Sequence, residues 1–243
     1  MTEQTVILAA GLGSRLGSAE AGIPKPLMEV GRQSLIAHAL AHAEASGCRQ
    51  AVVVIGYEGA RVRAAVEAVR SSLDVRFVES PDPHAPNGHS LLAAAACAHP
   101  EFFLQMVDHV FAQPVLPLLQ RRGPGGDGAR LLVDRTPDRT IDLADATKVR
   151  VVGGRISAIG KGLERWDAID TGCFHLTAAV FEALRAVPAG EPKTVSSAMR
   201  QLAAHGHLTA VEIDGVRWAD VDTPADRLVA EQLLLQAAVT RGA

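Results

Sequence analysis

The sequence has few of the features that would place the protein outside the cell or on a nucleic acid. Only three of its 243 residues are cysteines, and their odd number and wide spacing argue against a disulfide framework or a zinc site. Aromatic residues make up 4%, and 24 basic residues against 27 acidic ones give a net charge of -3. That balance provides no broad basic surface for DNA or RNA. We therefore expect a cytoplasmic protein that binds no nucleic acid.

Long apolar runs are also missing. The first run, residues 6–10, ends at Gly11 and lacks the basic start of a secretory signal. The richest apolar stretch, residues 91–107, is interrupted at residues 99–101, so it falls short of the roughly 18 residues that cross a bilayer. We expect no membrane insertion.

The apolar residues, 48% of the chain, follow an alternating pattern in the first half. Short runs typical of buried parallel strands alternate with amphipathic stretches typical of helices. Strands are predicted at residues 5–10, 51–56, 75–78 and 102–107, and helices after Ser34 and over 60–69 and 90–98. This order predicts an α/β fold with a Rossmann-like, doubly wound, mostly parallel sheet.

The second half has more strand pattern than helix pattern. Residues 121–128 are rich in glycine, which predicts an exposed loop. Strands are predicted at 130–133, 148–152, 155–159, 168–175 and 209–213, and helices at 195–205 and 224–240. We expect a small inserted β-rich region that binds substrate, within a single domain.

The first predicted strand runs into a glycine-rich segment that suits phosphate binding. Residues 8–17 read LAAGLGSRLG and are followed by PKP at 24–26. Glycines let backbone N–H groups approach phosphate oxygens, and Arg15 and Lys25 add cations that can clamp a polyphosphate. The segment has no Walker G-K-[ST], and Leu16 replaces the third glycine of the Rossmann fingerprint. The alternative is a glycine turn that only connects a strand to a helix. The presence of the two cations favours phosphate binding over this alternative.

This segment resembles the signature loop of the nucleotidyltransferases that make sugar nucleotides and related activated alcohol phosphates. Further matching segments follow in order: NGHSLL at 87–92, MVDHV at 106–110, ATKV at 146–149, IGKG at 159–162, DTG at 170–172 and WADVDTP at 218–224. The set is similar to the CTP:inositol-1-phosphate cytidylyltransferase branch. Many members of that branch are fused to a membrane-embedded alcohol phosphotransferase. The 243 residues include no segment of that kind, so the resemblance implies a separate membrane CDP-alcohol phosphotransferase as a partner.

The resemblance implies a role for each matching position. Arg15 and Lys25 would be catalytic. The nucleotide would contact Leu8, Ala9, Ala10, Gly11, Gly13, Ser14, Asn87, Gly88 and Ser90, and the acceptor would contact Lys148, Lys161, Asp170 and Thr171. The amide of Asn87 can read a base edge, although Asn-Gly is also an ordinary turn. Residues 1–243 would form one nucleotidyltransferase domain, with about 1–120 as the nucleotide-binding half and about 121–243 as the acceptor-binding and closing half.

Two aspartates are candidate metal ligands. Asp108 directly follows the strand predicted at 102–107, so it should lie at the carboxyl edge of the sheet, where ligands bind. The resemblance matches Asp108 and Asp220 to the two positions that hold Mg²⁺, an ion that prefers oxygen ligands. A helix cap is the alternative for each, and Asp222 stands where many relatives have glycine. If the strand continues, the side chain of His109 should point away from Asp108 and only support the site.

The reaction that the resemblance implies is attack of an alcohol phosphate on the α-phosphorus of CTP, giving CDP-inositol and pyrophosphate. A phosphate monoester is largely dianionic at neutral pH, so alignment and charge neutralisation suffice without a general base. The alternative acceptors are a hexose 1-phosphate, phosphocholine or a phosphonate, with CTP or another nucleotide. A regulatory subunit that binds nucleotide without turnover is a further alternative, and a homo-oligomer is possible. Gly160, Val107 and His89 depart from the patterns of relatives and leave the acceptor open.

Overall fold

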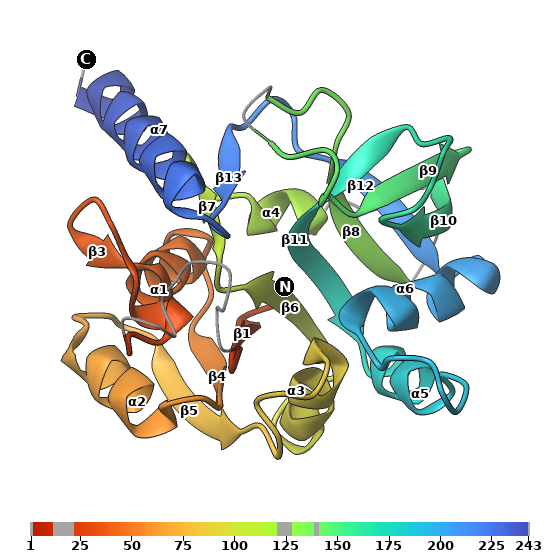
Figure 1. Cartoon of the computed structure of the whole chain (residues 1–243), viewed down its shortest axis with the longest axis horizontal. Coiled ribbons are helices and arrows are strands. Elements are labelled where there is room, and N and C mark those ends of the chain that lie inside the picture. Colours follow the sequence, from red (N-terminus) through yellow and green to blue (C-terminus); the bar gives the residue numbers. More distant parts are fainter. Residues whose placement is uncertain (1, 12–21, 121–127, 139–140, 243) are drawn as a thin grey trace.

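A mixed β-sheet runs through the whole molecule. The computed structural model describes residues 2–11, 22–120, 128–138 and 141–242. The strands of the sheet are β1 (Gln4–Ala9), β4 (Gln50–Ile55), β5 (Asp74–Glu79), β6 (Glu101–Met106), β8 (Ala129–Asp134), β9 (Lys148–Val152), β10 (Arg155–Gly160), β11 (Ala168–Thr177) and β12 (Leu208–Glu212). Within the described residues, these nine strands pair in the order β5-β4-β1-β6-β11-β8-β12-β10-β9 (Figure 1).

The parallel pairs are concentrated in the N-terminal half of the sheet. Strand β1 lies between β4 and β6, with Val6 opposite both Val52 and Leu104, and β5 extends the parallel set. Strand β11 then pairs antiparallel with β6 and β8, and β10 pairs antiparallel with β12 and β9. The predicted α/β fold is confirmed, and the strand-rich second half continues the same sheet.

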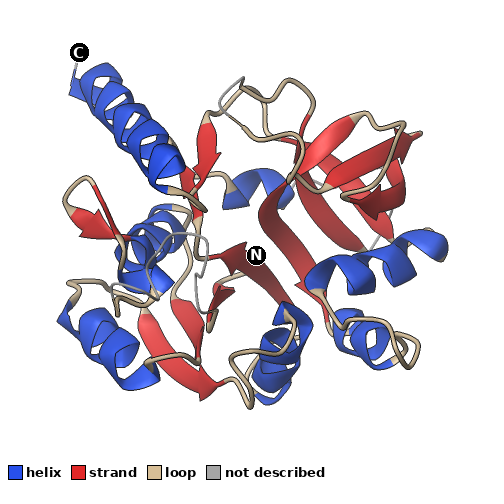
Figure 2. Cartoon of the chain, viewed as in Figure 1, coloured by secondary structure: helices blue, strands red, loops and turns tan. Residues whose placement is uncertain are grey.

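Helices cover both faces of this sheet (Figure 2). They are α1 (Leu35–Ala45), α2 (Gly59–Ala68), α3 (Asn87–Ala93), α4 (Leu116–Leu119), α5 (Ala179–Arg185), α6 (Val195–Ala204) and α7 (Pro224–Gly242), with the short 3-10 helices η2 (Lys25–Leu27) and η3 (Ala94–Ala96). Alternate residues of β1 enter different cores, because successive strand side chains point to opposite faces. Ile7 packs in the cluster that contains α1 and α2, whereas Val6 packs in the cluster that contains α3, α5 and α6.

Polar side chains at the helix ends explain where several helices begin. The helix predicted after Ser34 is confirmed as α1, and the hydroxyl of Ser34 accepts from Ala37 N and caps it. Thr194 and Ser197 form a capping box on α6. The helix that the sequence predicts from residue 224 is confirmed as α7. At its start, the carboxylate of Asp226 accepts from Thr223 N at 2.7 Å.

Two three-residue strands that matter for the site are not among the strands predicted from the sequence. Strand β7 (His109–Phe111) pairs antiparallel with β13 (Trp218–Asp220), which places Asp220 opposite His109. Figure 1 shows this pair beside α7, away from the main sheet. A second small pair, β2 (Glu29–Val30) and β3 (Gln33–Ser34), precedes α1.

Two further predictions concern the glycine-rich loop and membrane insertion. Residues 121–127 of the predicted glycine-rich loop lie outside the described residues. Among the residues that the structure does describe, no helix is both long enough and apolar enough to cross a membrane.

Candidate active site

Two pockets share part of their lining near the carboxyl ends of β1 and β6. The smaller, about 110 Å³, is lined by Lys25 and by predicted nucleotide-binding residues that include Leu8, Ala10, Gly11 and Ser90. The larger, about 400 Å³, includes the predicted acceptor residues Lys161 and Asp170. Asn87, Met106 and Asp108 line both pockets. The structure thus gathers predicted nucleotide and acceptor residues in two spaces with common walls.

Lys25 lies between two carboxylates where the pockets meet. Its Nζ is 2.6 Å from Asp108 Oδ2 and 2.5 Å from Asp222 Oδ1, and its side chain is only 9% exposed. Burial opposes the charge on Lys25, but the carboxylates of Asp108, Asp222 and Asp220 outweigh it and raise the pKa of the ammonium. Lys25 is therefore a buried positive charge on the wall of the smaller pocket, and it is bonded to Asp108, which lines both pockets.

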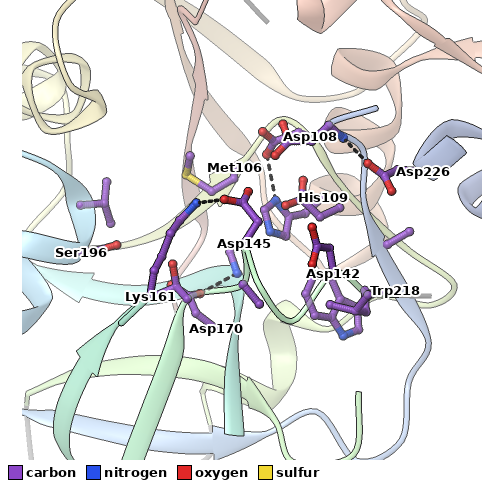
Figure 3. Close-up of a pocket in the computed structure, with 18 of the residues that line it drawn as sticks. Met106, Asp108, His109, Asp142, Asp145, Lys161, Asp170, Ser196, Trp218 and Asp226 are labelled. Carbon is purple, nitrogen blue, oxygen red and sulfur yellow. Dashed lines mark hydrogen bonds and ion pairs between the residues drawn. The ribbon is translucent and has the colours of Figure 1, made fainter. Parts of the chain in front are cut away.

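Asp108, His109 and Asp220 form a compact set of candidate metal ligands. One ligand atom from each lies within 4.8 Å of the others. The Nδ1 of His109 bonds Asp108 Oδ1 at 2.8 Å, as the dashed line in Figure 3 shows. The backbone N–H of Val221 donates to the carbonyl of Asp108 at 2.9 Å, which ties the β6–β7 turn to the chain after β13. Two segments more than a hundred residues apart are thereby fixed together.

The carboxylate of Asp220 is suited to a cation. Burial raises its pKa to about 6, and the carboxylates of Asp108 and Asp222 add to the shift against the opposing charge of His109. Its Oδ1 is buried and has no hydrogen-bond partner among the described residues. A buried carboxylate oxygen is costly unless it binds a proton donor or a cation. Two carboxylates and an imidazole in reach of one point therefore fit a divalent ion.

His109 corrects one expectation from the sequence. Its ring points toward Asp108, because β6 ends at Met106 and the chain turns before β7, which interrupts the strand alternation. The ring stacks on Trp218 with a centroid distance of 5.5 Å and an interplanar angle of 8°. Burial alone would lower the pKa of His109, but the carboxylates of Asp220 and Asp108 raise it to about 9.

Gly172 and Asp170 complete the surroundings of this ring. The carboxylate of Asp170 accepts from Gly172 N at 2.7 Å, and burial raises the pKa of Asp170 to about 6. Gly172 has a φ of +73°, and a Cβ there would lie 2.7 Å from the His109 ring. Thr171 is not among the lining residues, because its buried hydroxyl donates to the carbonyl of Leu132 at 2.9 Å.

The predicted base-reading segment lies between the two pockets. The side-chain oxygen of Asn87 accepts from Val195 N at 2.9 Å and so fixes the direction of the amide. Gly88 lines neither pocket, because its N–H donates to the carbonyl of Lys193 at 3.0 Å and a Cβ would collide with that carbonyl. Ser90 bonds the hydroxyl of Ser80 at 3.1 Å.

The remaining predicted residues differ in their placement. Lys161 lines the larger pocket and pairs with Asp145 at 2.5 Å. Lys148 is not a lining residue, and its Nζ donates to the backbone carbonyl of Lys161 at 3.0 Å. Ala9 packs in the core on the other face of β1. Gly13, Ser14 and Arg15 lie outside the described residues, and their roles stay predictions.

Three residues of this site were not assigned from the sequence. His109 and Asp222 both lie within the quoted motifs, so the signal was present but pointed first to their neighbours. Asp145 carries no motif signal, although it stands three residues before Lys148.

A family model and curated relatives match nearly the whole chain. The MobA-like NTP transferase domain matches residues 5–241. A bifunctional IPC transferase and DIPP synthase from Rubrobacter xylanophilus is 36% identical over 231 residues, which cover 94% of this chain and 51% of that protein. One of the same description from Thermococcus kodakarensis is 32% identical over 238 residues, 98% of this chain and 52% of that protein. The chain thus spans about half the length of these curated relatives.

A solved structure extends the comparison to the fold. The inositol-1-phosphate CTP transferase from T. maritima superposes with a TM-score of 0.85 and 22% sequence identity, and the match covers 97% of this chain and 96% of that one. At this identity the likeness shows the fold, which is that of a nucleotidyltransferase structure.

Proposed function

Because the chain belongs to the MobA-like NTP transferase family, we propose that it transfers CMP from CTP to inositol 1-phosphate, releasing pyrophosphate. One observation carries the proposal: Lys25 is held between Asp108 and Asp222, beside the unpartnered oxygen of Asp220, where two pockets meet. A nucleotidyl transfer needs a nucleotide and an acceptor to meet beside cations that offset phosphate charge. Lys25 is one such cation, and the surrounding carboxylates could hold a divalent ion as another. The 36% and 32% identical relatives, both described as IPC transferases, support this choice of acceptor.

The nucleotide occupies the smaller pocket in this proposal. The glycine-rich segment that follows β1 is proposed to bind the phosphates, and Asn87, fixed by Val195, would offer its amide to the base. Lys25 lies where the α-phosphorus must come, so its ammonium neutralises charge that develops there. Arg15 is proposed to hold the triphosphate from the same glycine-rich segment.

A magnesium ion completes the proposed site. Asp108 and Asp220 would hold it, with His109 as the group that orients Asp108. When bound, the ion supplies neutralisation of phosphate charge and a fixed template for the substrates. Lys25 keeps Asp108 ionised and directed into the site.

The acceptor enters through the larger pocket. Its phosphate monoester is a dianion at neutral pH and attacks without losing a proton to the protein. The site residues therefore only align the acceptor oxygen and offset charge, as Lys25 and His109 are placed to do. We also propose that residues up to about 120 form the nucleotide-binding half of the domain and that the later residues form the acceptor-binding half. The reaction is proposed to take place in the cytoplasm.

The proposal is tested by measuring pyrophosphate release from each of four nucleoside triphosphates with a panel of acceptors. The panel holds inositol 1-phosphate, glucose 1-phosphate, phosphocholine and 2-aminoethylphosphonate. We expect the highest kcat/KM for CTP with inositol 1-phosphate, and a requirement for Mg²⁺. Preference for another acceptor would overturn the substrate assignment, and absence of turnover with every pair would favour a nucleotide-binding regulatory subunit.

A further inference from the structure

An ion pair lines the part of the larger pocket that comes from residues 141–147 and from Lys161, which directly follows β10. Lys161 Nζ lies 2.5 Å from Asp145 Oδ1. Figure 3 shows the pair joined inside the pocket, near the side chain of Met106. The side chains are 54% and 39% exposed, respectively, so a molecule in the pocket can reach both of them.

Neighbouring hydrogen bonds fix where this pair stands. The segment around Asp145 is closed by Asp142, whose carboxylate accepts from Ala144 N at 2.9 Å and whose carbonyl accepts from Ala146 N at 2.9 Å. The carbonyl of Thr147 accepts from the backbone N–H of Asp170 at 2.8 Å, which anchors the segment to β11. The pair is therefore built into the pocket wall and does not depend on a free loop tip.

The chemistry of the pair matches a hydroxylated ring. A carboxylate offers about four acceptor positions and an ammonium three donors, and each ring hydroxyl needs both kinds of partner. Since the two charges offset each other, the pair does not repel a phosphate dianion elsewhere on the ligand. An acceptor with its own ammonium would have to displace Lys161 from Asp145. The pair therefore suits neutral hydroxyls better than a cationic head group.

We propose that Asp145 and Lys161 recognise the ring hydroxyls of a cyclic polyol phosphate whose phosphate end faces Asp108 and Lys25. The inference rests on the proposed function, because that function places the acceptor in the larger pocket. Asp145 then determines specificity by accepting hydrogen bonds from the ring. Lys161, which the resemblance predicts to contact the acceptor, positions Asp145 and donates to the same hydroxyls.

The test compares two acceptors that differ only in ring hydroxyls. Pyrophosphate release with CTP is measured for inositol 1-phosphate and for cyclohexyl phosphate, in the wild type, Asp145→Ala and Lys161→Met. Asp74→Ala is the matched control, because Asp74 is an exposed aspartate of β5 outside both pockets. We expect Asp145→Ala to lower kcat/KM for inositol 1-phosphate by roughly ten- to a hundredfold. Turnover of cyclohexyl phosphate and the KM for CTP should change by less than about threefold.

The outcomes separate this inference from the proposed function. If the wild type turns over inositol 1-phosphate but Asp145→Ala slows both acceptors equally, recognition by Asp145 is wrong and the proposed function stands. If the wild type instead prefers glucose 1-phosphate, the proposed acceptor is wrong, and the same comparison with glucose 1-phosphate decides the role of Asp145. If the wild type uses no polyol phosphate, both are overturned.

Discussion

Gly172→Ala tests whether the position of the His109 ring matters for catalysis. The added Cβ would lie 2.7 to 2.8 Å from three atoms of that ring, whereas ordinary contacts begin at about 3.4 Å. The ring would have to withdraw by roughly half an ångström or more. It cannot do so freely, because Trp218 stacks on it and Asp108 bonds its Nδ1.

Two effects add in this variant and can be separated. The left-handed backbone of Gly172 costs alanine about 1–2 kcal/mol, and the clash adds about 1–3 kcal/mol. Gly153→Ala is the control, since Gly153 also has a positive φ, of +56°, but has no atom within 4 Å of the added Cβ. We expect Gly172→Ala to lower the Tm by several degrees more than Gly153→Ala does. Its kcat should fall about ten- to a hundredfold, because small misplacements at a reacting centre are costly.

The measurements are thermal unfolding and steady-state pyrophosphate release with CTP and inositol 1-phosphate. A double variant identifies the cause: in a His109→Ala background, Gly172→Ala should destabilise only as much as Gly153→Ala, because the clash is gone. If Gly172→Ala matches Gly153→Ala in both Tm and kcat with His109 present, the ring gives way at no cost and our account of its placement is refuted.

Three further predictions concern single side chains. Lys25→Ala should lower kcat about a hundredfold or more and destabilise the fold by about 3–5 kcal/mol, because the substitution leaves two buried carboxylates uncompensated. The double variant Lys25→Ala/Asp222→Asn should regain part of the lost Tm but no turnover. Recovery of turnover in the double variant would exclude Lys25 from the chemistry. Asp220→Asn should abolish the Mg²⁺-dependent activity. The Tm of this variant should equal or exceed that of the wild type, because a buried charge is removed. A variant that stays active and Mg²⁺-dependent would contradict the metal assignment. Burial lowers the pKa of His42 from 6.5 to about 4, so the contribution of His42 to stability is present above pH 6.5 and is lost as the pH falls toward 4. Over that range, the difference in unfolding free energy between wild type and His42→Phe should shrink by up to about 3 kcal/mol, as measured by urea titration. A difference that stays constant would show that His42 protonates freely in the folded protein.

Much of the sheet could be predicted because its strands carry their own signal. The runs at β1, β4 and β6 are apolar on both faces, since helices cover both sides of the sheet, and such runs are recognisable without any partner. Strands β7 and β13 have only three residues each. Their pairing depends on a partner more than a hundred residues away, so no local pattern indicates it.

The candidate site divides in the same way. Lys25, Asp108 and Asp220 could be named because they fall in motifs, and the structure brings them together. His109 was assigned the wrong direction because strand alternation does not continue through the turn after Met106. Asp145 could not be found at all, because its relation to Lys161 is a tertiary contact between residues that share no motif.

The β7–β13 pair also determines when the site can exist during synthesis. Its second strand, Trp218–Asp220, is made after all nine strands of the main sheet. The core cluster around β1, β4 and β6 also contains Trp218, Ala219 and Val221. Neither this core nor the contact of Lys25 with Asp222 can therefore be complete until these residues have emerged. Lys25 is bracketed by both of its carboxylates only once the chain beyond residue 222 has emerged and docked. The last part of the chain to be made thus completes the hydrophobic core and the candidate active site together.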